Sequence, residues 1–152
     1  MPTVETKHFG TVEYEEESAL EFPAGLPGFE ERRRFVALCS PDTQPLIFLH
    51  SLEDPGLCFL TLPVLVVDRQ YQLRVSAEDR DLVGLPQGRP LRLGEDVLCL
   101  AVLSLRESGP TANLLGPLVV NLRNRKAVQA VTADSGYSHQ QALVPEEAPV
   151  CS

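Results

Sequence analysis

Proline and glycine interrupt this chain so often that long regular elements have little room. Thirteen prolines and ten glycines are spread through 152 residues, and proline breaks both helices and central strands. Short apolar segments rich in Val, Leu, Ile and Phe lie between these breaks, a composition that favours strands. The pattern predicts an all-β fold, an antiparallel β-barrel or barrel-like sandwich with a few short helical turns.

The predicted strands follow one another at short intervals. In the first half we expect them at residues 4–7, 10–14, 19–22, 34–38, 46–52, 57–62 and 71–75. In the second half we expect them at residues 97–105, 118–122 and 127–132. The turn signal Asp-Pro-Gly at residues 54–56 predicts that the strands on either side of it pair as a hairpin.

Two segments carry helical signals. Ser76 can cap a helix over residues 76–83, which has acids in its first turn and meets Gly84 at its end. Residues 111–117 are expected to form one helical turn ended by Gly-Pro. The sequence after residue 137 has no periodic pattern, so we expect one domain over residues 1–137 and a mobile C-terminal tail over residues 138–152.

The charge balance of the chain is acidic. Thirteen Lys and Arg against 21 Asp and Glu give a formal net charge of −8. Binding to nucleic acid needs basic residues that neutralise phosphates, so we expect no direct nucleic-acid partner and favour a basic one. No apolar run approaches the roughly 20 residues that cross a bilayer, and no secretory signal is visible. We therefore expect a cytoplasmic chain with no membrane partner.

The sequence lacks the common motifs of catalysis and metal binding. It contains no P-loop, dinucleotide-binding glycine pattern, nucleophile elbow or zinc-protease motif, and its cysteines form no C-x-x-C pair. His50 and Ser51 are adjacent, but neighbours on a strand point to opposite faces and cannot form a dyad. Cys58 and Cys99 lie in apolar runs and are expected to be buried free thiols, with Cys151 reachable. We expect no enzyme, no cofactor and no metal.

Two acidic patches are candidates for contact with a basic partner. The first is the N-terminal acidic run at the end of a predicted strand: Glu13, Glu15, Glu16 and Glu17. The second is the turn pair Glu53 and Asp54. The alternative for the N-terminal acidic run is a solvated strand edge that discourages pairing between sheets. The alternative for the second patch is turn chemistry, in which an Asp side chain holds the backbone.

Several strings of residues, in order along the chain, resemble the FliW family of flagellar assembly factors. They lie at residues 5–10, 22–30, 46–59, 111–121 and 134–137. The string FPAGLPGFE at residues 22–30, together with TANLLGP at residues 111–117, is the most specific part. The likeness covers about residues 3–143.

The resemblance implies a non-enzymatic β-barrel protein of the cytoplasm that binds flagellin as a chaperone. It also implies binding to CsrA, a small RNA-binding translational regulator. Free flagellin would occupy the protein, and flagellin export would release it to capture CsrA and relieve repression of flagellin synthesis.

Three residues of the resembling strings have expected local roles. Phe22 and Phe29 are expected to anchor their loop onto the barrel. Asn113 is expected to cap the local backbone, with contact to a partner as the alternative. A different class of function also stays open: a small-ligand-binding β-barrel, or a degenerate enzyme on that scaffold, would use the barrel interior as its pocket.

Overall fold

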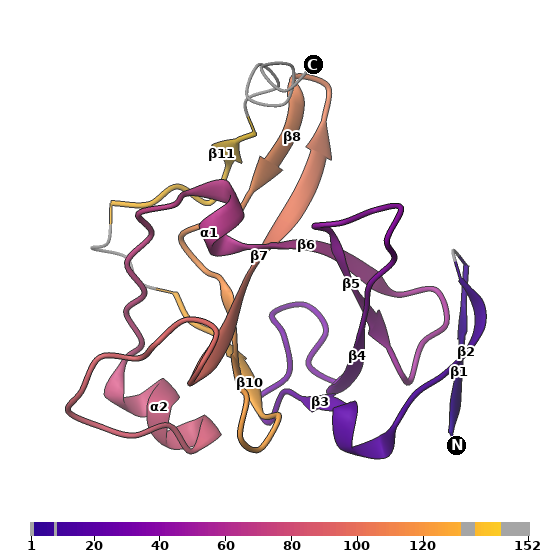
Figure 1. Cartoon of the computed structure of the whole chain (residues 1–152), viewed down its shortest axis with the longest axis horizontal. Helices are drawn as coiled ribbons and strands as arrows, with labels where there is room; N and C mark the ends of the chain where they lie inside the picture. The colour runs from indigo at the N-terminus through magenta and orange to yellow at the C-terminus, as the bar shows by residue number, and fades with distance from the viewer. Residues whose placement is uncertain (1, 8, 132–135, 144–152) are drawn as a thin grey trace.

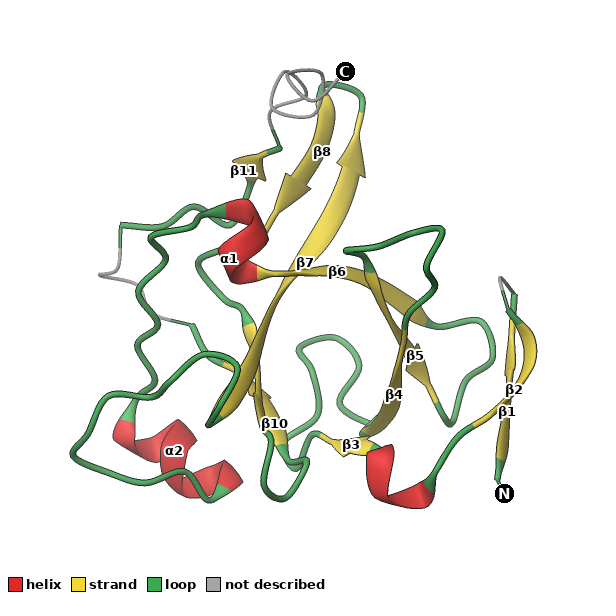
Figure 2. Ribbon diagram, in the orientation of Figure 1, coloured by secondary structure: helices red, strands yellow, loops and turns green. Residues whose placement is uncertain are grey.

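The structure is a computed structural model that describes residues 2–7, 9–131 and 136–143. Antiparallel strands dominate these residues, with short helical pieces between them (Figure 2). The strands are β1 (Thr3–Thr6), β2 (Gly10–Glu13), β3 (Leu20–Glu21), β4 (Arg34–Leu38), β5 (Ile47–Ser51), β6 (Cys58–Pro63), β7 (Val97–Arg106), β8 (Gly109–Ala112), β9 (Leu118–Asn121), β10 (Ala127–Gln129) and β11 (Gln141–Ala142). The helices are α1 (Val64–Val67) and α2 (Ala77–Val83), and Glu16–Ser18 forms a 3-10 turn.

One large sheet forms the body of the molecule, with neighbouring strands in the order β10-β9-β7-β6-β5-β4-β3. Each neighbouring pair is antiparallel. The sheet curls until its two edges meet (Figure 1): at the β3 edge the Glu21 N–H donates to the Arg125 carbonyl oxygen, 2.9 Å away, just before β10. Glu21 also forms a parallel bridge with Lys126. The predicted all-β, barrel-like fold is confirmed.

The long strand β7 joins the barrel to a projecting hairpin (Figure 1). Its first residues pair with β9 and its last residues pair with β8, while β6 pairs with it on the other side. Strands β1 and β2 form a separate two-stranded sheet. This sheet lies beside the barrel, where the ring centroids of Phe9 and Phe48 are 5.1 Å apart.

Most strands and helix α2 lie where the sequence predicts them. Strand β4 has the predicted bounds, and β5 and β6 pair as the predicted hairpin. In α2 the Ser76 hydroxyl accepts the Asp79 N–H at 3.1 Å, and Gly84 ends the helix in the left-handed region with a φ of 76°. Local signals determine these elements.

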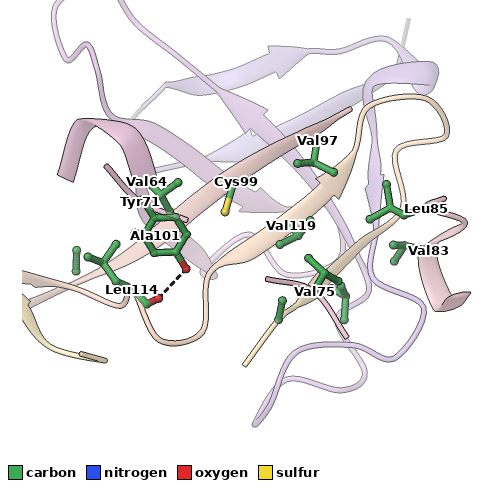
Figure 3. Close-up of a cluster of buried hydrophobic side chains, with 13 residues drawn as sticks. Val64, Tyr71, Val75, Val83, Leu85, Val97, Cys99, Ala101, Leu114 and Val119 are labelled. Carbon is green, nitrogen blue, oxygen red and sulfur yellow. Dashed lines mark hydrogen bonds between the residues drawn. The ribbon is translucent and has the colours of Figure 1, made fainter. Parts of the chain in front are cut away.

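The strand predicted at residues 71–75 is wrong. These residues alternate between buried and exposed, but they pair with no strand among the described residues. Tyr71 and Val75 fill a core cluster, and the Tyr71 hydroxyl donates to the Leu114 carbonyl oxygen at 2.8 Å (Figure 3). Alternation of apolar and polar residues indicates one-sided burial, and burial does not require a neighbouring strand.

Two other segments also differ from expectation. Residues 111–117 form no helical turn, because Thr111 and Ala112 belong to β8 and pair with β7. Residues 64–67 form α1 directly after β6, although their β-branched composition does not indicate a helix. Pro63 stands at the N-cap of α1, where its missing N–H leaves no intrahelical bond unmade.

The fold extends past the boundary that we expected after residue 137. Strand β11 pairs with β8, the Leu114 N–H donates to the Ser138 carbonyl oxygen at 2.9 Å, and Leu143 packs against a core cluster. Residues 138–143 therefore belong to the folded unit. The local sequence does not predict this, because the strand with which they pair lies far away along the chain. The rest of the expected tail, residues 144–152 with Cys151, lies outside the described residues.

Alternate residues of β7 and β9 face two different hydrophobic clusters. Val97, Cys99 and Val119 face the outer cluster, which α1, α2 and residues 71–75 cover (Figure 3). Leu100 and Leu118 face the interior cluster, which the loop between β3 and β4 plugs with buried side chains. This two-sided burial explains why β7 and β9 are apolar along most of their length.

The cysteines occupy three different environments. Cys99 is buried in the outer cluster, and burial raises the pKa of its thiol to about 12. Cys58 is half-buried rather than fully buried as expected, and partial burial raises the pKa of its thiol as well. Cys39 is exposed.

Candidate interaction site

The loop at residues 22–30 folds back on itself at Gly25. Gly25 has a φ of +70°, and a Cβ added there would lie 2.6 Å from both the Cα and the carbonyl oxygen of Glu30. Only glycine fits this close approach. Phe22 and Leu26 are buried in the interior cluster, so the loop closes the barrel as a plug. Phe22 is the anchor that we expected.

Phe29 is also expected to anchor the loop onto the barrel, but it does so only in part, because it is not buried. Its side chain is 40% exposed, and it makes an edge-to-face contact with Phe59, with ring centroids 5.5 Å apart. The Phe29 N–H donates to the Leu26 carbonyl oxygen at 2.7 Å in a tight turn, and the ring contacts strand β6 from a partly exposed position.

The two most specific strings of the sequence meet at a groove of about 220 Å³, which we call the barrel-mouth groove. Its apolar lining includes Leu26, Pro27 and Phe29 from the loop, Phe59 from β6 and Leu118 from β9, while Asn113 comes from the second string. The other half of the lining is polar: Ser104, Arg106, Asn113, Gln129, His139 and Gln140. A groove with an aromatic ring left exposed is suited to receive apolar side chains of another protein.

Asn113 has the local role that the sequence predicts for it. Its Oδ1 accepts the Gly116 N–H at 2.8 Å, which fixes the turn between β8 and β9. The same turn is held from the opposite side, because the Gln129 Nε2 donates to the Gly116 carbonyl oxygen at 2.9 Å. Both amides line the barrel-mouth groove.

Parts of both predicted acidic patches contact the arginines at residues 32–34, at the start of β4. Glu16 forms an ion pair with Arg34. The Glu53 carboxylate accepts the backbone N–H groups of Arg33 and Arg34 at 2.7 and 3.0 Å. The fold thus brings parts of the two patches together, with arginine between them.

The Asp54 side chain holds the backbone of its own turn, which was the alternative to contact with a partner. Its Oδ1 accepts the Gly56 N–H at 2.9 Å, and its Oδ2 lies 3.6 Å from the Arg32 Nε. Sequence reasoning missed these arginines, although residues 32–34 are consecutive and visible in the sequence. What it could not supply was the pairing of β4 with β5, which brings them to the turn after β5.

His50 and Ser51 bond to different partners. The His50 Nδ1 lies 2.9 Å from the Ser51 carbonyl oxygen, while the Ser51 hydroxyl accepts the N–H groups of Glu53 and Asp54, each at 3.0 Å. Within residues 2–7, 9–131 and 136–143, no three or more His, Cys, Asp and Glu side chains gather as ligands for a metal ion. The described part of the chain also holds no helix long and apolar enough to cross a membrane.

The closed antiparallel sheet, its plugged mouth and the groove beside the plug define a class: small barrel-like β proteins with an open groove of mixed polarity. A sequence model of the FliW protein family matches residues 3–143. The chain therefore belongs to the FliW family, and the resemblance noted in the sequence is confirmed.

Known proteins with this likeness cover nearly the whole chain. The flagellar assembly factor FliW of Pseudothermotoga lettingae is 37% identical over 144 residues, which cover 91% of this chain and 85% of that protein. The flagellar assembly factor FliW of Treponema denticola is 31% identical over 145 residues, covering 94% of each chain. A crystal structure of the flagellar assembly factor FliW superposes with a TM-score of 0.82 at 27% identity, covering 96% of this chain and 99% of that one.

Proposed function

We propose that this chain is a non-enzymatic protein of the cytoplasm that binds flagellin as a chaperone and binds the translational regulator CsrA. Binding to CsrA relieves its repression of flagellin synthesis when no flagellin occupies the chain. Membership of a family of flagellar assembly factors supports this proposal, because assembly of a filament requires both a protected subunit and control of its supply.

The barrel-mouth groove is the observation that carries the flagellin half of the proposal. Phe29 and Phe59 offer an aromatic surface beside the plug, and grooves with such a surface receive one face of an amphipathic helix. The filled interior supports this over the small-ligand alternative, because Phe22, Leu26 and Leu100 occupy the space inside the sheet. At about 220 Å³ the groove is also smaller than the roughly 300–1,000 Å³ of typical small-molecule sites.

The net charge of −8 carries the CsrA half of the proposal. A regulator that binds RNA presents positive charge to phosphates, and an acidic protein attracts that surface over a long range. The N-terminal acidic run, with Glu53, Asp54 and Asn113, is the partner-binding surface that the sequence predicts, although Glu16, Glu53 and Asp54 already bond to residues 32–34.

The test is direct binding of the purified chain to purified flagellin and purified CsrA by calorimetry. We expect binding to both, and about tenfold weaker flagellin binding by Phe29→Ala, because an exposed aromatic anchor is lost. The matched control is Val66→Ala, which removes an apolar side chain that is 50% exposed on α1. A native chain that binds neither protein would overturn the proposal.

A further inference from the structure

A second groove lies next to the barrel-mouth groove, and the two share Pro27 and Gln129. Helix α2, the loop at residues 22–30 and strand β10 with the residues that follow it line this groove of about 590 Å³. We call it the acidic groove and define it by four acids and two apolar side chains: Glu30, Glu78, Asp79, Asp81, Leu82 and Val131.

The carboxylates that α2 brings to the acidic groove are free of basic partners. Within the described residues, none of Glu78, Asp79 and Asp81 forms an ion pair. Arg80 is the one base on α2, but its guanidinium donates to carbonyl oxygens before and after the helix. Those bonds tie Arg80 to the chain around α2, so the helix presents negative charge to the groove.

The groove also contains exposed apolar surface between its acids. Leu82 is 38% exposed and Val131 is 61% exposed, whereas the next residue of α2, Val83, is completely buried. Exposed apolar side chains among acids match a protein segment that carries one apolar side chain between basic ones. It does not match a nucleic acid or an anionic membrane surface, since both carry negative charge.

Both ends of the helix that carries these acids are held in place. Ser76 caps the start of α2, and the side-chain amides of Asn121 and Asn124 donate to the Val83 carbonyl oxygen at its end, at 2.9 and 3.0 Å. A rigid helix loses little conformational freedom on binding, which increases affinity for a complementary partner.

We propose that the acidic groove receives a basic segment of CsrA, with an apolar side chain between Leu82 and Val131 and Lys or Arg side chains paired with the acids of α2. This inference rests on the proposed function, which supplies the basic partner. It places the CsrA contact on α2 in preference to the N-terminal acidic run, where Arg34 already pairs with Glu16.

The experiment compares two variants that each remove three negative charges. The groove variant carries Glu78→Gln, Asp79→Asn and Asp81→Asn. The matched control carries Glu13→Gln, Glu15→Gln and Glu17→Gln and leaves the ion pair of Glu16 intact. Affinity for CsrA and for flagellin is measured by calorimetry at low and moderate salt, and circular dichroism with thermal melting checks that each variant is folded.

We expect the groove variant to bind CsrA at least about tenfold more weakly than the control, with a shallower dependence on salt. Flagellin affinity should stay unchanged in both. A second variant, Leu82→Ala, removes only apolar surface and should weaken CsrA binding without changing the salt dependence.

Equal CsrA affinity and equal salt dependence in the two triple variants would overturn this inference while leaving the proposed function intact. Selective loss in the control would also overturn it and would assign CsrA to the N-terminal acidic run. Failure of the native chain to bind CsrA at all would overturn that half of the proposed function and, with it, the partner named here.

Discussion

The two acidic regions of the molecule look alike in sequence but differ in what the fold places opposite them. The N-terminal acidic run has four glutamates within five positions, yet Arg34 pairs with Glu16, and the neighbouring Glu53 binds the backbone of the same arginine run. The other three glutamates of the run form no ion pair among the described residues, and neither do the three acids of α2, so the difference is that one acid of the run is neutralised and none of α2 is. Charge available to a partner is therefore set by tertiary neighbours as much as by charge density along the chain.

The two regions also differ in how much of the fold supports them. The N-terminal acidic run lies on the end of β2 and a 3-10 turn that has no side-chain cap. The acidic groove depends on the plug loop, on β10 and on capped helix α2. Three substitutions perturb these supports of the groove, and a fourth perturbs the ion pair of the run.

The largest effect is expected for Gly25→Ala. The new Cβ would meet the Glu30 backbone at 2.6 Å in a left-handed conformation, so the plug loop must shift and the free energy of unfolding should fall by about 3 kcal/mol or more. Urea unfolding measures this. Gly28→Ala is the control: its φ is +84° but no atom lies within 4 Å of the added Cβ, so only the left-handed cost of about 1–2 kcal/mol applies. Equal losses for both variants would contradict the steric argument.

A smaller loss is expected for Asn121→Ala at the end of α2. The buried Asn121 amide donates to the Val83 carbonyl oxygen and accepts the Arg123 N–H, so its removal should cost about 1–3 kcal/mol. The exposed Asn124 makes the same bond to Val83 and provides the comparison. We expect Asn124→Ala to lower the free energy of unfolding by about 1 kcal/mol at most. Chemical denaturation measures the stability loss of each variant. A larger loss in Asn124→Ala than in Asn121→Ala would show that burial is not what makes Asn121 important.

The helix cap gives the third effect. Ser76→Ala removes the acceptor of the Asp79 N–H and should destabilise the protein by about 1 kcal/mol. Ser76→Asp keeps an acceptor at that position and should stay within a few tenths of a kcal/mol of the native chain. Thermal melting distinguishes the two variants, and an equally large loss in Ser76→Asp would exclude capping as the cause.

The smallest effect on stability is expected for Arg34→Gln, which breaks the ion pair with Glu16. Both side chains are largely exposed, at 44% and 60%, so the loss should be under about 1 kcal/mol. The variant nevertheless frees a carboxylate in the N-terminal acidic run, and CsrA association at low salt should become about twofold faster. Arg34→Lys keeps the charge and should leave the association rate unchanged. Stopped-flow measurements compare the two, and an equal rate increase in both would refute this account.

Local signals in the sequence predict much of the fold. The cap at Ser76, the stop at Gly84 and the turn at residues 54–56 each depend on one residue and its immediate neighbours, and each lies where it was predicted. The strand prediction at residues 71–75 is wrong because alternation of apolar and polar residues does not distinguish a paired strand from a segment buried on one side. Strand β11 is not predicted from the sequence, because its partner β8 is distant along the chain and meets it only in the folded protein.

The candidate site was less predictable than the fold for the same physical reason. The two specific strings could be read from the sequence, but their meeting at one groove requires the closed sheet. The sequence shows the acids of α2 as favourable residues for a helix N-terminus. Nothing in the local sequence indicates that Arg80 bonds to carbonyl oxygens and leaves these acids unpaired.

The bond between Glu21 and Arg125 also governs how the protein can be made. A ribosome delivers the N-terminal strands first, at about 5–20 residues per second, so β3 must wait until the turn before β10 has emerged. Until then Phe22 and Leu26 lack the β9 and β10 side chains that cover them in the interior cluster, and the open edges of the sheet can pair with other chains. A chain halted between β7 and β9 therefore lacks the residues that close the sheet and cover its interior cluster.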